Sequence, residues 1–411
     1  MKKTLFYMML LAGAVACQMA EESQAPVKEE VPASVFHATL EGAEAETKVY
    51  TDEALHVLWN ADDRVTIFAK TTRNKQYRFL GADGAAGGDF EEVVGGFGTG
   101  EEIDYNFAVY PYNATTAYSY GDDASDPSDD YLATVFPKAQ TYRAGSFGPG
   151  ANLMVTKSST TDLPFKNVGG YLCLKLYGSG FSVRSIVLRG NNNETLSGPV
   201  KVSIGDGNIP SMEFDTADPS KLEKEIVLSA DTPVALGADA ANAVTFWMVV
   251  PPATLSGGFT VTVIDGNGGM HQKSTSKSIT FERNKQTPMK AFEITAGDVL
   301  APLTVDEMGS VSLAGTGFSY DKATDQVNLY EQDNKVWARF LRVPTLTMFE
   351  IGPIPADVAV GSNFVADVDV YVDGVKNESE SVTDCRLTVQ SITGGIINLV
   401  SDDGTRYAIR F

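Results

Sequence analysis

Histidine, cysteine and clustered positive charge are scarce in this sequence, and each scarcity excludes a class of function. The 411 residues include three histidines, His37, His56 and His271, whose positions share no metal-ligand spacing. Acidic residues outnumber basic ones 53 to 32, the formal net charge is −21, and no run of Lys and Arg occurs. This charge balance argues against binding to a nucleic-acid backbone. The one long apolar run is N-terminal, which excludes a polytopic membrane fold.

Three cysteines are too few for a disulfide framework. Cys17 lies in the N-terminal leader, and Cys173 and Cys385 lie in apolar strand-like patterns. We interpret the latter two as buried thiols that act as small hydrophobic groups, and a single bridge between them remains open.

Sequence motifs of catalysis are also missing. The chain has no His-Glu-x-x-His, Cys-x-x-Cys or Gly-x-Ser-x-Gly pattern, and the glycine-rich segment 95–100 lacks the Lys-Ser/Thr of a phosphate loop. The turn Asp265–Gly269 looks like the start of a calcium loop, but Ser276 occupies the position where an EF-hand needs Glu. We therefore expect no enzyme activity, no cofactor and no metal site. A carboxylate pair of a glycan-processing enzyme stays open, because the sequence does not give spatial separations.

The N-terminus carries the most specific signal. Met1–Lys3 is basic, residues 4–15 are apolar, and Ala14-Val15-Ala16-Cys17 follows. The run is shorter than the roughly 20 residues that span a bilayer. It resembles a bacterial lipoprotein signal peptide, residues 1–16, with its lipobox. The resemblance implies acylation of Cys17, palmitate among the acyl groups, and a lipid anchor in the membrane.

The residues after Cys17 favour the outer membrane. Gln18 stands where an Asp would suggest retention in the inner membrane, and Glu21-Glu22 resembles the surface-export tag of Bacteroidetes lipoproteins. We expect a lipoprotein exposed on the surface of the outer membrane, with residues 17–32 as an acidic linker.

From residue 33 onward the pattern is typical of an all-β protein. Short runs rich in Val, Thr, Phe and Tyr alternate with Gly, Asn and Asp clusters, and helical periodicity is nearly absent. Composition shifts predict three β domains, at 33–160, 161–297 and 298–411, with sandwiches as the default architecture. In the second domain, Phe259–Ile264 predicts a strand that returns near Ser278–Phe281.

Two segments are candidates for recognition. Six tyrosines between Tyr105 and Tyr131 surround the acidic stretch 121–130, and tyrosines on loops bind ligands well. A buried strand followed by a solvated acidic loop explains the same residues. Asp367, Asp369 and Asp373 alternate with valines, which is more typical of the outer face of a strand than of a metal site.

Three stretches carry a family resemblance: Phe107–Tyr112 (FAVYPY), Leu163–Leu172 (LPFKNVGGYL) and Phe246–Pro252 (FWMVVPP). In this order behind a lipobox, they resemble the fimbrillin family of Bacteroidetes, the lipoprotein precursors of type V pili. The resemblance covers residues 33–297 and implies two fimbrillin-like β-sandwich domains. Residues 298–411 lie outside it and form an appended β domain.

The resemblance also implies a mode of assembly. In the family, a protease removes the first β-strand at the outer surface, and the groove left behind accepts a strand of the next subunit. Here the removable strand would contain Val35, Phe36, Ala38 and Leu40. The C-terminal residues Tyr407, Ile409 and Phe411 have the alternation of a donor strand, although an ordinary closing strand would look the same.

The processing site departs from the family pattern. Arginine-specific maturation needs an Arg just after the first strand, yet Arg64 is the first Arg after the leader, and Lys48 lies nearer. Either another protease acts, or the first strand stays in place. With the appended domain, this favours a terminal fimbrial subunit, at the tip or the anchor, that serves cell adhesion and has other fimbrial subunits as partners. The alternative is a monomeric outer-membrane lipoprotein whose third domain binds a glycan or a host protein.

Overall fold

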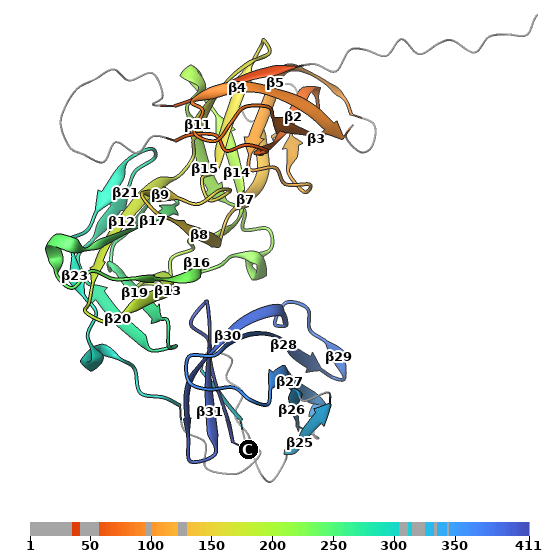
Figure 1. Cartoon of the computed structure of the whole chain (residues 1–411). Helices are drawn as coiled ribbons and strands as arrows, with labels where there is room; N and C mark the ends of the chain where they lie inside the picture. The colour runs from red at the N-terminus through yellow and green to blue at the C-terminus, as the bar shows by residue number, and fades with distance from the viewer. Residues whose placement is uncertain are drawn as a thin grey trace, which may run out of the picture. The chain divides into compact units, whose positions relative to one another are not determined.

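The computed structural model of the chain is built almost entirely of β-strands, which confirms the all-β prediction (Figure 1). Its helices are four 3₁₀ turns within the described residues: η1 (Asp206–Asn208), η2 (Pro219–Lys221), η3 (Ala240–Asn242) and η4 (Ala296–Asp298). In the same part of the chain, no helix is long and apolar enough to span a membrane. The structure describes residues 35–41, 57–94, 100–121, 130–303, 311–314, 325–332, 335–342 and 345–410.

The N-terminal domain is a closed barrel of seven strands. Around the barrel the order is β1, β11, β10, β5, β2, β3 and β4. Side chains that alternate along these strands fill its interior with an aromatic-rich core. The strands are β1 (Phe36–Leu40), β2 (Arg64–Thr71), β3 (Lys75–Phe79), β4 (Gly87–Val94), β5 (Glu102–Tyr110), β10 (Met154–Ser158) and β11 (Asp162–Asn167).

The sheets cross the domain boundary that the sequence suggested at residue 160. β11 lies beyond this boundary but closes the barrel, because it pairs with β1 and β10. A separate four-stranded sheet, in the order β15-β14-β7-β6, joins strands from both sides of the boundary. Its strands are β6 (Ala117–Ser119), β7 (Tyr131–Phe136), β14 (Gly198–Ile204) and β15 (Pro210–Phe214). The first two expected domains are therefore interleaved, a long-range arrangement that local composition does not encode.

The second domain is a sandwich, as predicted, in which two main sheets share one hydrophobic core. The first sheet contains β12 (Gly170–Tyr177), β17 (Val244–Val250), β22 (Gln286–Pro288) and β23 (Phe292–Glu293). The second contains β8 (Ala139–Arg143), β9 (Ser146–Phe147), β13 (Ser182–Gly190), β16 (Glu225–Ala235), β19 (Phe259–Asp265) and β20 (Met270–Thr275). Two short strands, β18 (Ala253–Leu255) and β21 (Ile279–Phe281), pair with each other.

One predicted hairpin returns earlier than expected. β19 pairs with β20, at Met270–Thr275, whereas the expected return strand near 278–281 is β21, which pairs with β18. The reason is the tightness of the turn: the carboxylate of Asp265 accepts hydrogen bonds from the backbone N–H groups of Asn267 and Gly269. The turn residues serve the connection, as the sequence suggested.

The C-terminal domain is a single sheet of nine strands rather than two facing sheets. Its order is β24-β32-β31-β30-β28-β27-β26-β25, with β29 paired to β28, and one core cluster packs on it. The strands are β24 (Val311–Ala314), β25 (Asp325–Gln332), β26 (Lys335–Arg342), β27 (Thr347–Pro355), β28 (Asn363–Val372), β29 (Val375–Lys376), β30 (Val382–Thr393), β31 (Ile396–Ser401) and β32 (Arg406–Arg410).

Cys173 and Cys385 are both free and buried, in β12 and β30. The two thiols lie in the cores of different domains, so the bridge left open by the sequence is not formed. Burial raises the pKa of the Cys385 thiol to about 12, which keeps it protonated and unreactive.

Candidate functional site

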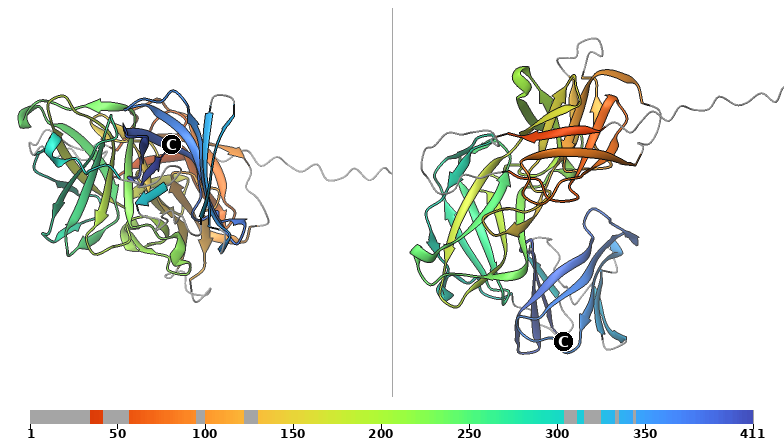
Figure 2. Two further views of the ribbon diagram at one scale, coloured as in Figure 1. Left: turned by 90° about the horizontal axis from the view of Figure 1, so that it is seen from below. Right: turned by 45° about the horizontal axis from the view of Figure 1, so that its top comes forward.

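The first strand, β1, is held in a groove of the barrel between β4 and β11. It runs antiparallel to β4, with Phe36 opposite Phe90, and parallel to β11, with Leu40 opposite Phe165. Figure 2 shows β1, in red, between the orange strand β4 and the yellow-orange part of the barrel. A strand paired on both sides closes the sheet, so the barrel is complete only with β1 in place.

The side chains of β1 alternate between the core and the surface. Phe36, Ala38 and Leu40 are buried, whereas Val35, just before the strand, is 52% exposed. The Phe36 ring meets the Tyr77 ring edge to face, with centroids 5.3 Å apart. Three of the four residues predicted for the first strand therefore fill core positions, and Val35 does not.

Two glycines in β4 shape the groove. A Cβ on Gly87 would lie 2.7 Å from the carbonyl oxygen of Ala38, and one on Gly88 would lie 2.8 Å from the Phe79 ring. Both contacts are too close for a side chain. The groove therefore accepts the backbone of β1 because these positions carry none.

The residue after β1 is fastened by an ion pair. The guanidinium of Arg283 donates to both carboxylate oxygens of Glu41, at 2.6 and 2.9 Å, and the backbone N–H of Asn167 donates to the same carboxylate at 3.0 Å. Burial raises the pKa of Glu41, but the hydrogen bonds from Arg283 and Asn167 outweigh it and hold the pKa below its ordinary value of 4.5. We call this contact the Glu41 latch. It ties the end of β1 to the second domain.

The two processing candidates have different standing. Lys48 lies outside the described residues, in the segment 42–56 between β1 and the rest of the barrel. Arg64 begins β2, where its carbonyl oxygen accepts a hydrogen bond from the Tyr112 N–H at 2.8 Å and the next residue, Val65, is fully buried. A protease cannot extend this bond into an active site while the barrel is folded.

The candidate donor strand is already in use. β32 pairs with β31 on one side and with β24 on the other, and Tyr407 and Ile409 are buried in the core of the C-terminal sheet. Phe411 and the lipidation candidate Cys17 lie outside the described residues. In this structure β32 is a closing strand of its own domain.

The other recognition candidates resolve into local structure. Tyr110 is buried, Tyr105 is 38% exposed with the Lys157 ammonium 4.5 Å from its ring centre, and residues 122–129 lie outside the described part. Asp369 pairs with Lys376 at 3.0 Å, and Asp367 accepts the Asp384 N–H at 2.9 Å. The remaining member, Asp373, lies in the turn between β28 and β29.

Sequence reasoning missed Trp59, the aromatic centre of the barrel. Its indole is 1% exposed and has ring contacts at 5.0–5.8 Å, with Phe79, Phe90, Tyr110 and Phe165. Phe90 and Phe165 are the residues opposite β1 in the register of both walls of the groove. A lone Trp shortly before a strand was the available signal.

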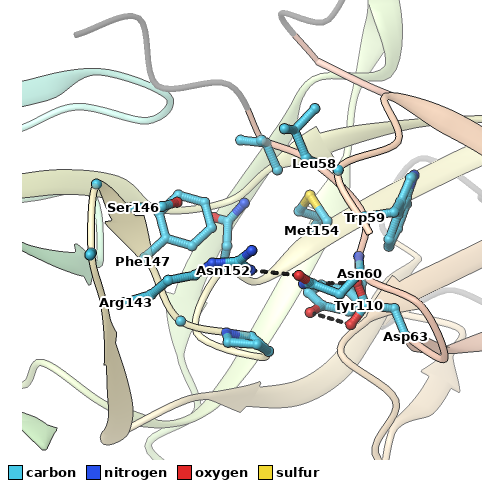
Figure 3. A pocket seen from close by; sticks show the side chains of 16 residues that line it. Leu58, Trp59, Asn60, Asp63, Tyr110, Arg143, Ser146, Phe147, Asn152 and Met154 are labelled. Carbon is cyan, nitrogen blue, oxygen red and sulfur yellow. Dashed lines mark hydrogen bonds between the residues drawn. The ribbon is translucent and has the colours of Figure 1, made fainter. Parts of the chain in front are cut away.

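A pocket opens beside Trp59, at the end of the barrel, with a volume of about 300 Å³ (Figure 3). Arg143, Ser146 and Phe147 of the β8–β9 hairpin line one side, and Trp59 and Tyr110 line the other. We call it the barrel-end pocket. Because β9 pairs with β8 of the second domain's sheet, the pocket is framed by both interleaved domains.

Comparison with known proteins gives similarity in fold at low identity. No family model matches the sequence, and no curated protein matches it. A structure provisionally described as a cell adhesion protein, from Bacteroides ovatus ATCC 8483, matches at 15% identity and a TM-score of 0.35, covering 63% of this chain and 91% of that one. Another so described, from Bacteroides uniformis ATCC 8492, matches at 14% and 0.35, covering 66% and 95%. A fimbrial protein from Bacteroides ovatus ATCC 8483 matches at 10% and 0.21, covering 64% and 50%.

At these values the residue assignments rest on the geometry of this chain alone. The matched structures are described as Bacteroides adhesion and fimbrial proteins, in agreement with the fimbrillin-like resemblance of the sequence, and what this chain shares with them is an all-β fold.

Proposed function

We propose that the chain is a surface fimbrial subunit that is completed by β-strand addition and serves cell adhesion. The observation that supports this most directly is β1, a five-residue strand that fills the barrel groove with Phe36, Ala38 and Leu40. It is joined to the rest of the barrel only through the segment 42–56. One cut in that segment would free the whole strand.

The groove would retain strong affinity for a replacement. Burial of Phe36, Ala38 and Leu40 is worth about 4–6 kcal/mol, and the backbone groups of β4 and β11 add hydrogen bonds. An empty groove leaves two strand edges and an apolar channel exposed, which strongly favours capture of another strand.

The groove also defines the strand it would accept. The entering strand needs apolar side chains at three alternate positions, with the middle one small, as in Phe36, Ala38 and Leu40. Loss of β1 removes Glu41 as well and leaves the Arg283 guanidinium without its carboxylate partner. We therefore expect an acidic residue just after the apolar alternation in the partner strand.

We further propose a terminal subunit that accepts a strand and does not donate one. The supporting observation is β32, whose Tyr407 and Ile409 are core residues of its own sheet, so donation would dismantle the C-terminal domain. A cut within 42–56 also separates the chain from Cys17. The accepting form is thus released from its lipid and suits the tip, whereas an anchor would keep Cys17 and β1.

Cross-linking mass spectrometry on the surface fraction of native cells tests the proposal. Strand addition predicts that peptides of β4 and β11 cross-link to the terminal segment of another fimbrial subunit, in complexes that resist salt and detergent. The monomeric lipoprotein is supported instead if β4 and β11 cross-link only to residues 35–41 of the same chain and the protein migrates as one band.

A further inference from the structure

The barrel-end pocket has firm aromatic walls. Trp59 is fixed by its ring contacts in the core, and the Phe147 ring stacks on Tyr171 with centroids 5.3 Å apart and planes within 6°. The Tyr110 hydroxyl donates to Asp63 at 3.0 Å and accepts the Gly150 N–H at 2.9 Å. Because these rings are held by their neighbours, a ligand would meet a preformed surface.

Polar groups lie between these aromatic walls. Asn152 is 1% exposed; its amide N–H donates to Asn167 at 2.6 Å, and its Oδ1 has no hydrogen-bond partner among the described residues. Arg143 is exposed at the rim and donates one N–H to Asn60 Oδ1 at 2.5 Å, which leaves other guanidinium N–H groups for a ligand. The pocket thus offers both a buried acceptor and rim donors.

The charges of the lining select against ionic ligands. Arg143 is balanced by Asp63, whose carboxylate already accepts from the Asn60 N–H at 2.7 Å and from Tyr110. One exposed cation next to a carboxylate, in a chain of net charge −21, is a poor site for phosphate or acidic groups. The buried amide and carboxylate equally disfavour a purely apolar ligand.

From this combination we infer that the barrel-end pocket binds a neutral sugar unit, one or two rings at the end of a glycan. A sugar ring has an apolar face for the aromatic walls and hydroxyl groups that both donate and accept, which matches the Asn152 acceptor and the Arg143 donors. The volume of about 300 Å³ lies at the small end of ligand pockets and suits this size. The inference is separate from strand addition, because the pocket lies outside the β1 groove.

The test is a titration of the purified full chain in detergent with free glucose, galactose, mannose, fucose, N-acetylglucosamine and N-acetylgalactosamine, with sialic acid as the acidic comparison. Trp59 is one of three tryptophans and lines the pocket, so tryptophan emission reports binding. Saturation-transfer NMR gives an independent readout. The variants are Arg143→Ala and Phe147→Ala, with Arg78→Ala as the matched control, since Arg78 is a partly exposed arginine of the same barrel away from the pocket.

We expect saturable binding of at least one neutral sugar, weakened about tenfold or more by Arg143→Ala and Phe147→Ala and changed less than about twofold by Arg78→Ala. Thermal unfolding of each variant controls for folding; if Phe147→Ala does not fold, the rim variant Arg143→Ala decides alone. The inference is overturned if no neutral sugar binds saturably, if sialic acid alone binds, or if Arg143→Ala binds as well as Arg78→Ala.

Discussion

Glu41 and Arg283 form a two-point ion pair between the end of β1 and the second domain, across 242 positions of the sequence. Both side chains are largely shielded, at 14% and 24% exposure, so solvent weakens the pair less than a surface contact. Because the latch holds the residue at which β1 ends, it stabilises the strand in its groove.

Glu41→Gln is therefore expected to destabilise the barrel by about 1–3 kcal/mol near neutral pH, since it leaves Arg283 without its charge partner. The exposed neighbouring pair Glu282–Lys285 provides the control, and Glu282→Gln should change stability by less than about 1 kcal/mol. Denaturant unfolding followed by Trp59 fluorescence measures both. Equal effects of the two variants would remove the latch from the account.

The latch also predicts a pH dependence. Because the pKa of Glu41 is lowered by folding, its contribution is fully present above the ordinary value of 4.5 and is lost as the pH falls through the lower folded value. The stability difference between the wild type and Glu41→Gln should thus shrink in acid. A difference that stays constant from neutral pH to about pH 3 would contradict this sign.

Ala38→Glu should eject β1, because it places a charge at a fully buried position, at a cost of about 3 kcal/mol or more. Thr39→Glu, on the half-exposed side of the same strand, is the matched control. Limited proteolysis checks the result: residues up to Glu41 should be released from Ala38→Glu much faster than from Thr39→Glu. Similar release rates would mean that the alternation of β1 does not hold it.

Gly87→Ala is expected to loosen β1 without altering it, since the new methyl group would press on the Ala38 carbonyl. The expected loss is about 1–3 kcal/mol. Gly205→Ala is the control, because the nearest atom to its added Cβ lies 3.8 Å away. Hydrogen exchange of the β1 amides should quicken only in Gly87→Ala, and unchanged protection there would contradict the close approach.

Ile409→Asp tests whether the C-terminal strand is a structural strand. Ile409 is fully buried, and an aspartate there should destabilise the C-terminal sheet by about 4 kcal/mol while the barrel keeps its stability. Hydrogen exchange resolves the two domains. A variant whose C-terminal sheet stays intact but whose assembly fails would instead identify β32 as a donor strand.

Local patterns predicted what depends on neighbours in sequence. The alternation of Phe36, Ala38 and Leu40 indicated a half-buried strand, and the residues after Asp265 indicated a turn, and both are present. The parallel pairing of β1 with β11 was not accessible, because a register between segments far apart leaves no periodic trace. The Glu41 latch was hidden for the same reason, as an isolated Glu after a strand is ordinary in an acidic chain.

The most direct test of strand replacement is N-terminal sequencing with intact-mass measurement of the protein recovered in fimbrial complexes from native cells. The account predicts a free N-terminus within residues 42–56, with β1 and Cys17 absent and a strand of another subunit retained in the groove. A lipidated Cys17 terminus in every recovered copy, with residues 36–40 still present, would contradict it.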